Sequence, residues 1–267
     1  MSTPASSHDD CVNVTKTHDE ARPRGEGGLA APCGRRKVGV IQSNYIPWKG
    51  YFDIIHSVDM FVFYDDVQYT KNDWRNRNLI KTPNGTEWLT IPVGKSEQRL
   101  ICEVRIEDQQ WRAKHWKAIQ LHYRRARYFK QYSDFFENVY LRTEWSNLSV
   151  LNQFLIKTIA TDFLGIRTEF VDSRQFQLGE KKLGRLIELL RKVQATEYLS
   201  GPSAKAYIED GVFEREGVGL EYKEYGNYPA YDQLFSPPFI HEVSIVDLLF
   251  NVGPEAPWYI WGYRNGS

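Results

Sequence analysis

The pattern of apolar and polar residues predicts an α/β fold that begins after the N-terminal tail. An apolar run at 38–41, typical of a buried strand, precedes a polar, glycine-bearing turn, a helix-like segment and a second apolar run at 59–64. A strand, a helix and a second strand in this order form a parallel crossover. Small ligands in open α/β sheets usually bind at the turns that follow the carboxyl ends of such strands. We therefore expect a polar organic ligand at the first of these turns, which contains Gln42, Asn44 and Tyr45.

The middle of the chain is expected to contain a hairpin, a strand and two helices. Asn84-Gly85 between two β-like runs is a strong hairpin signal, because both residues accept positive φ. Residues 99–106 alternate apolar and polar side chains, which predicts a half-buried strand. Helical spacing of large side chains predicts one helix over 111–122 and a second over 148–163.

The last third of the chain continues the α/β alternation. Its expected elements are a strand at 166–171, an amphipathic helix at 183–193, a strand, turn and helix start within 197–204, a short strand at 219–224, and a helix capped by Ser244. We therefore expect a single α/β domain over 37–267. It should have a Rossmann-like, mixed or parallel sheet with flanking helices, a β-hairpin insertion and a helical subdomain at about 107–195.

Composition narrows the class of protein. Of the 267 residues, 42% are hydrophobic, which is enough for a sizeable core. Lys plus Arg and Asp plus Glu both number 34, so the charge gives no reason to expect a nucleic-acid or membrane-surface partner. No run of about 18 apolar residues predicts a membrane span. Three cysteines without a CxxC pair do not make a disulfide framework and favour a reducing compartment.

The N-terminal tail, 1–36, is rich in Ser, Pro, Gly and charge and lacks the apolar core of a signal peptide. We expect it to be a disordered extension and the protein to be cytoplasmic. Farther along, 111–130 holds seven basic residues and no acid. That segment is interpreted either as a solvated helix face or as a positive rim for an anionic substrate.

Two adjacent acids, Asp65 and Asp66, end the second predicted strand. Neighbouring strand residues face opposite ways, so only one of them can point into a given site. A carboxylate there could act as a general base or bind a metal, and the alternative is a helix cap or a partner for nearby arginines.

The segment that follows combines arginines, asparagines and aromatic residues, which together suit a nucleotide or an activated sugar. Arginine forks grip carboxylate or phosphate through two hydrogen bonds, and aromatic rings offer stacking surface. The candidate binding residues in it are Tyr69, Arg75, Asn76 and Arg77. The alternative is an exposed loop that is polar by chance.

Two further candidates come from later in the chain. His115 is interpreted either as an acid/base group or as a packed or surface histidine. His122, seven residues on, faces the same side of the helix, but a third zinc ligand is missing, so no metal site is expected. Ser200 and Gly201 precede a predicted helix start, where free amide groups favour an anion. The motifs GxxxxGK[ST], GxSxG, GxGxxG and HExxH are absent.

Several long motifs resemble the WbqC-like family. They are the stretch 42–52, Asp65-Asp66-Val67-Gln68-Tyr69 with Trp74-Arg75-Asn76-Arg77, the run 88–93, Tyr198-Leu199-Ser200-Gly201, and the run 244–253. The resemblance spans residues 37–253. It implies an association with bacterial surface-polysaccharide and natural-product biosynthesis, where some members are described as glycine or aminoacyl transferases acting on amino-sugar nucleotides. A looser similarity is to nucleotidyltransferase-like Rossmann folds, but Trp48-Lys49-Gly50-Tyr51 replaces their HxGH and argues against adenylation by that mechanism.

The leading hypothesis is a biosynthetic acyl or aminoacyl (glycyl-type) transferase that forms an amide on an amine, such as an amino-sugar nucleotide or a natural-product intermediate. Its substrates would be small and anionic, and no organic cofactor is indicated. The base would be one of Asp65, Asp66 and His115. Phosphate or carboxylate charge on the substrates would be held by Arg75, Arg77 and the Ser200-Gly201 turn. The developing oxyanion would be bound by Gln42, Asn44 and Asn76.

Two alternatives stay open. One is an ATP-dependent carboxylate–amine ligase or another nucleotide-binding enzyme. The other is a non-catalytic binding or carrier-docking protein that uses the basic segment 111–130.

Overall fold

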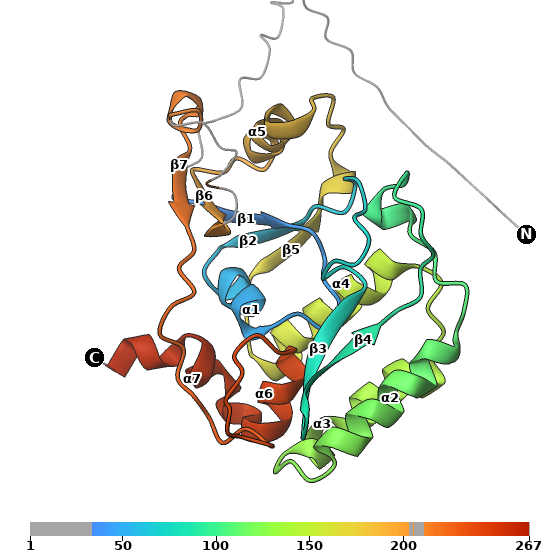
Figure 1. Cartoon of the computed structure of the whole chain (residues 1–267). Helices are drawn as coiled ribbons and strands as arrows, with labels where there is room; N and C mark the ends of the chain where they lie inside the picture. The colour runs from blue at the N-terminus through green and yellow to red at the C-terminus, as the bar shows by residue number, and fades with distance from the viewer. Residues whose placement is uncertain (1–33, 203–204, 206–210, 267) are drawn as a thin grey trace, which may run out of the picture. The chain divides into compact units, whose positions relative to one another are not determined.

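A five-stranded parallel sheet lies at the centre of the structure, a computed structural model that describes residues 34–202, 205 and 211–266 (Figure 1). The strands of this sheet are β1 (Lys37–Ile41), β2 (Met60–Phe63), β5 (Glu169–Asp172), β6 (Glu197–Ser200) and β7 (Gly219–Tyr222). The helices are α1 (Lys49–His56), α2 (Gln110–Tyr123), α3 (Phe129–Glu137), α4 (Leu148–Thr158), α5 (Lys182–Lys192), α6 (Ile245–Val252) and α7 (Ala256–Ile260). The predicted Rossmann-like α/β fold with flanking helices is confirmed.

The strand order is β5-β2-β1-β6-β7, and every neighbouring pair is parallel. The chain starts in the middle with β1, builds outward through β2 and β5, and then returns to add β6 and β7 on the other side of β1. The direction of winding therefore reverses between β1 and β6. In open α/β sheets the crevice outside the carboxyl ends of two such strands is the usual place for a ligand.

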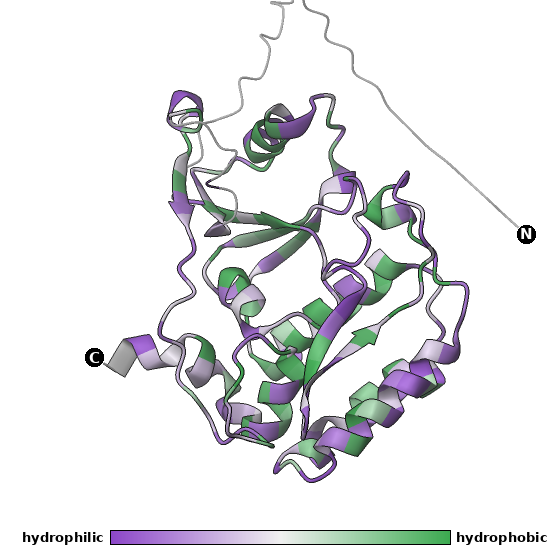
Figure 2. Ribbon diagram, viewed as in Figure 1, coloured by the Kyte–Doolittle hydropathy of each residue, from purple (hydrophilic) through white to green (hydrophobic). Residues whose placement is uncertain are grey.

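Alternation along the strands separates two cores. Val40, Val62 and Tyr198 belong to the smaller core, which α5 covers with Leu189 and Leu190. The intervening residues of the strands face the larger, aromatic core, which includes residues of α1, α2, α3, α4 and α6. Figure 2 shows hydrophobic residues along the central strands and on α5.

The predicted hairpin is also confirmed. Strands β3 (Arg77–Thr82) and β4 (Gly85–Thr90) pair antiparallel, with Thr82 opposite Gly85 across the turn. Gly85 has φ of +117°, a conformation that an L-residue rarely adopts. The hairpin lies beside α2 (Figure 1), and β3 contacts both α2 and α6.

The predicted strand at 99–106 is wrong. This segment contains a 3₁₀ turn, Ile101–Glu103, and only single bridges flank it, Gln68 with Leu100 and Arg105 with Asn147. The alternating pattern predicted Leu100, Cys102, Val104 and Ile106 on the inner side. Val104 and Ile106 are buried, but the turn also buries Ile101 and leaves Leu100 36% exposed. The buried residues Ile101 and Val104 are three positions apart, which is the period of a 3₁₀ turn, whereas a strand would bury every second residue.

The described residues, from 34 onward, form one compact unit. Most of the predicted N-terminal extension, 1–36, lies outside the described residues, as do Ser203 and Ala204 of the predicted helix start. Arg36 is described, and its carbonyl accepts hydrogen bonds from the amides of Thr196 and Glu197. Within the described residues, no helix has the length and apolar character needed to cross a membrane.

Candidate functional site

The turn between β1 and α1 lies at the point where the sheet reverses its winding. Gln42 directly follows β1, and Ser200 is the last residue of the neighbouring strand β6. Ser200 is buried, and its hydroxyl lies 3.2 Å from that of Tyr198. The Gln42 carbonyl accepts a hydrogen bond of 3.0 Å from the Tyr51 hydroxyl. The turn and the β6 end therefore border the crevice where this fold class usually binds ligands.

Hydrogen bonds from three other segments fix this turn. The Ser43 amide donates to Asp65 Oδ1 at 2.8 Å, and the Tyr45 amide donates to the Trp74 carbonyl at 3.0 Å. The Asn78 side-chain amide donates at 3.0 Å to the carbonyls of both Tyr45 and Ile46. The acidic strand end and the arginine-bearing segment thus meet the turn.

Asp65 stabilises the turn through its hydrogen bond with the Ser43 amide. It is fully buried and accepts hydrogen bonds from Ser149 at 2.5 Å and from Gln153 at 3.1 Å, in addition to the Ser43 amide. Three donors therefore hold both carboxylate oxygens in place, in a site that no solvent reaches.

Asp66 faces the opposite side of the sheet, toward α5. It accepts a hydrogen bond of 2.5 Å from Ser173 and forms an ion pair with Arg185, a residue of α5. Its side chain is 12% exposed. The structure therefore separates the two acids on the two faces of the sheet, as alternation along a strand requires.

His115 lies in the larger core beneath the turn. Its Nδ1 is 2.9 Å from the Tyr45 hydroxyl and its Nε2 is 3.2 Å from the Thr90 carbonyl. Because a carbonyl only accepts, Nε2 carries the proton of the neutral ring, and Tyr45 donates to Nδ1. Burial lowers the pKa of His115 to about 4, so the ring is neutral near pH 7. Tyr45 is itself buried and hydrogen-bonded to Tyr140, so this cluster orients the turn from inside.

The remaining predicted residues, on the segment after β2, are largely engaged within the protein. Asn76 donates to the Ile91 carbonyl at 2.9 Å, and Arg75 pairs with Asp73 at 2.6 Å. The Arg77 guanidinium stacks 4.2 Å from the ring centre of Trp88. Tyr69 is 1% exposed. These contacts shape the loop that carries Trp74.

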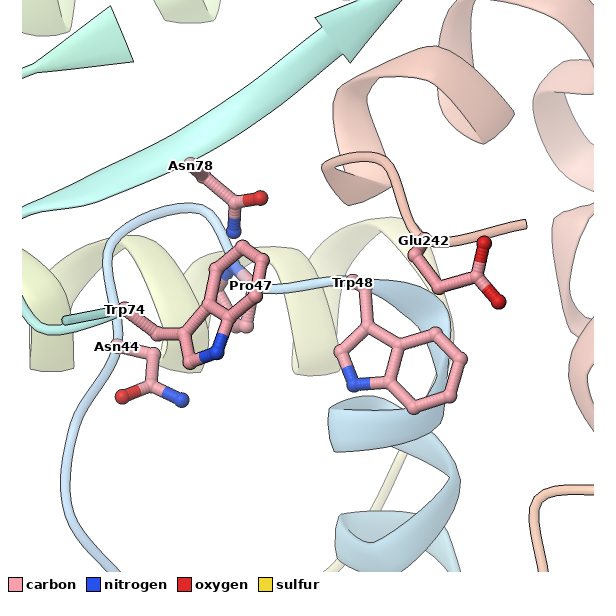
Figure 3. Close-up of a pocket in the computed structure, with 6 residues that line it drawn as sticks. All are labelled: Asn44, Pro47, Trp48, Trp74, Asn78 and Glu242. Atoms are coloured by element: carbon pink, nitrogen blue, oxygen red, sulfur yellow. The ribbon is translucent and has the colours of Figure 1, made fainter. Parts of the chain in front are cut away.

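A pocket of about 270 Å³ opens beside the turn on the hairpin side (Figure 3). We call it the indole pocket, after two of its lining residues, which are Asn44, Pro47, Trp48, Trp74, Asn78 and Glu242. Trp48 and Trp74 come from different segments and flank it, and Glu242 lies at the Trp48 end.

The polar groups of the indole pocket include two acceptors. Asn44 Oδ1 is buried and has no hydrogen-bond partner among the described residues. Glu242 contributes an exposed carboxylate. The Asn78 amide is already committed to the turn. Asn44 Oδ1 and the Glu242 carboxylate, which lies at the Trp48 end, together with the indole rings suit a ligand that carries N–H or O–H donors or a cationic amine.

A second pocket, of about 500 Å³, lies on the other side of the turn, against α5. We call it the α5 pocket; its lining residues are Val40, Gln42, Tyr64, Lys182, Leu183, Leu186 and Tyr198. Gln42 lines this pocket and Asn44 lines the indole pocket. Only Ser43 lies between these two residues, so their Cα atoms are at most about 7 Å apart.

Sequence reasoning found Gln42 and Asn44 but missed Glu242, Tyr64 and Lys182. Tyr64 follows its strand with the same spacing as Gln42, so alternation could have placed both on one face. Glu242 comes from a loop far along the chain, and no local pattern indicates it. Across the part of the chain that the structure describes, no cluster of three or more metal-ligating side chains occurs.

Comparisons with known proteins agree with the motifs. Residues 42–259 match the WbqC-like protein family. An uncharacterized protein from Mycobacterium tuberculosis (strain ATCC 25618 / H37Rv) is 45% identical over 228 residues, which cover 84% of this chain and 97% of that protein. No solved structure matches the chain.

Proposed function

The chain belongs to the WbqC-like protein family, and on that premise we propose that it is a biosynthetic transferase that forms an amide between an activated acyl or aminoacyl donor and an amine. The single observation that carries this proposal is the pair of pockets on either side of the 42–44 turn, at the reversal point of the sheet. A transfer reaction needs two substrates held next to each other, and two adjacent pockets of unlike chemistry supply that arrangement.

The amine acceptor is assigned to the indole pocket. An ammonium group is attracted to indole faces and to acceptor oxygens, and this pocket offers Trp48 and Trp74 together with Asn44 Oδ1 and Glu242. Indole faces also stack against the apolar face of a sugar ring. An amino sugar therefore fits the pocket in both of its chemical features.

The attacking amine must lose a proton before its nitrogen forms a bond to the acyl carbon. The bond between that carbon and the donor's activating group then breaks, and this group leaves with the electron pair. Glu242 is the carboxylate that lines the indole pocket, and we assign it the role of general base. Asp65 and His115, which were candidate bases on sequence grounds, are buried and engaged with the turn, so their contacts favour a positioning role. Asp66 lies on the α5 side, paired with Arg185.

Substitution of Glu242 tests the assignment. We expect Glu242→Gln to reduce turnover by about 10²-fold or more, the usual contribution of a general base. The matched control is Glu107→Gln, an exposed acid outside both pockets, with turnover like wild type. The assay would combine amino-sugar nucleotides with aminoacyl and acyl donors and detect the amide by mass spectrometry. Wild-type turnover in Glu242→Gln would contradict the assigned base.

An ATP-dependent ligase is the second candidate, and the parallel sheet with its reversal point favours it, because many nucleotide-binding enzymes use that architecture. Such an enzyme would activate a free carboxylic acid itself. Amide formation from a free acid that requires ATP and releases pyrophosphate or ADP would identify the ligase. Amide formation from a preactivated donor without ATP would identify the transferase.

A further inference from the structure

We propose that the α5 pocket binds a nucleoside phosphate, with the base against the tyrosines and leucines and the phosphate at Lys182. This inference deepens the proposed function and rests on it, since it names the chemical class of one of the two substrates. It concerns the α5 side of the turn, whereas the amine is assigned to the indole pocket.

The position of the pocket is the first argument. Val40, Gln42 and Tyr64 line it from the carboxyl ends of β1 and β2, and Tyr198 lines it from β6. The pocket therefore lies at the reversal between β1 and β6, where nucleotides bind in doubly wound sheets. Its volume of about 500 Å³ is within the range of pockets that hold small organic ligands.

The lining separates into an apolar part and a polar part. Leu183 and Leu186 on α5, together with Val40 on β1, supply apolar surface in addition to the phenol rings of Tyr64 and Tyr198. A planar heteroaromatic ring buries both faces in such a site. Burial raises the pKa of Tyr64 to about 12, so its phenol keeps its proton and can donate a hydrogen bond.

Two polar groups of the lining are free to bind a ligand. Among the residues that the structure describes, neither the side-chain amide of Gln42 nor the Lys182 ammonium has a hydrogen-bond or ion-pair partner. A Gln side chain offers one acceptor and two donors, which match the hydrogen-bonding edge of a base. Lys182 is exposed at the start of α5 and can pair with a phosphate.

Several activated substrates share this chemistry. An acyl adenylate and coenzyme A carry an adenosine phosphate, and a nucleotide sugar carries a uridine or another nucleoside diphosphate. Isothermal titration of the full chain with ADP, UDP and coenzyme A would show which class binds. ADP or coenzyme A would assign the α5 pocket to the donor, and UDP would assign it to the nucleotide part of an amino-sugar acceptor.

Three variants locate the binding. Leu186→Trp fills the pocket and should abolish nucleotide binding, with circular dichroism and the Tm as checks that the variant folds. Lys182→Gln should weaken binding by about 10-fold, the effect of losing one charge-assisted phosphate contact. The matched control is Lys181→Gln, an exposed neighbour outside the lining, with the affinity of wild type.

The outcomes separate this inference from the proposed function. Absence of binding by all three compounds, or equal binding by wild type and Leu186→Trp, would overturn the assignment. Equal affinities of Lys182→Gln and Lys181→Gln would overturn the placement of the phosphate. Nucleotide binding with these properties, but no amide product from any donor and amine, would support the inference and reject the transferase. Amide formation that is unaffected by Leu186→Trp would support the transferase and reject the assignment of the α5 pocket.

Discussion

At the scale of single residues, two titratable side chains at and beneath the turn, His115 and Lys49, are buried and form no ion pair with the described residues. His115 lies among Tyr45, Tyr140 and Trp111, and burial lowers its pKa to about 4. Lys49, at the start of α1, is 3% exposed, and burial lowers its pKa to about 8. Each group is less easily protonated in the folded protein than in the unfolded chain. Stability should therefore depend on pH in two separate windows.

The first window belongs to His115. Between its ordinary pKa of 6.5 and its folded value of about 4, the unfolded chain binds a proton that the folded protein does not. Stability should therefore fall as the pH is lowered through this range, by about 2–3 kcal/mol, with no contribution from His115 above it. Urea unfolding at about pH 7 and about pH 4 would measure this, with His115→Gln as the variant that cannot titrate. A loss of the same size in His115→Gln would refute the assignment.

The second window belongs to Lys49. Its ammonium lies 5.0 Å from the ring centre of Tyr228 and 3.1 Å from His241 Nδ1. Burial lowers its pKa by more than the carboxylates of Asp247 and Glu242 raise it. Between the folded pKa of about 8 and the ordinary 10.5, the unfolded chain holds the extra proton, so stability should rise with pH. We expect wild type to gain about 1–2 kcal/mol relative to Lys49→Met between about pH 7.5 and 9.5. Parallel unfolding curves for the two proteins would show that Lys49 titrates normally.

At the scale of elements, the β3–β4 hairpin and the β1–α1 turn form one unit. Asn78 of β3 is buried and donates to two consecutive carbonyls of the turn, at Tyr45 and Ile46. Ile46 has φ of +35°, an unusual conformation for a β-branched residue, so these bonds and one from Ser244 hold it in place. The hairpin therefore fixes the turn that separates the two pockets.

Asn78→Ala should accordingly affect both stability and the indole pocket. The Tyr45 carbonyl would lose its Asn78 donor, and the Ile46 carbonyl would keep only its bond from Ser244. We expect a loss of about 2–3 kcal/mol in the free energy of unfolding, with weaker amine binding. Asn138→Ala, an exposed asparagine with no side-chain bond to the turn, is the control and should change stability by less than about 0.5 kcal/mol. Denaturant unfolding measures the first effect and amine titration the second. Equal stabilities of the two variants would argue against a stabilising role for the Asn78 hydrogen bonds to the turn.

The elements also show what the sequence could predict. The alternation that places Asp65 and Asp66 on opposite faces is local, as is the Asn84-Gly85 turn, and both were predicted correctly. The 99–106 strand failed because its alternating residues form a turn with an inward spacing of three. Glu242 reaches the indole pocket from more than 160 residues beyond Trp74, through the folded arrangement alone. The sequence also could not show whether a polar side chain faces a ligand or a backbone carbonyl, as that of Asn76 does.

At the scale of the whole molecule, one buried carboxylate joins distant parts of the chain. Asp53 on α1 is fully buried and accepts hydrogen bonds from Lys223 after β7 at 2.8 Å, from Tyr228 at 2.6 Å and from Arg264 near the C-terminus at 2.9 Å. These cations and the phenol lower the pKa of Asp53 although burial alone would raise it. The helix that follows the 42–44 turn is thereby tied to the last segment of the chain.

Asp53 and its partner Arg264 should contribute unequally to the free energy of unfolding. Asp53→Ala should cost about 3–5 kcal/mol, because Lys223, 9% exposed, is left as an uncompensated buried charge. Arg264→Met should cost less, about 1–2 kcal/mol, since its side chain is 36% exposed and Lys223 still neutralises Asp53. If the three groups act as one unit, the double variant will be more stable than the sum of the single losses predicts, and a double-mutant cycle from urea unfolding measures the difference. If the losses in the free energy of unfolding are strictly additive, apolar contacts and not Asp53 hold the C-terminal segment, and Asp53 stabilises only the segment after β7 through Lys223.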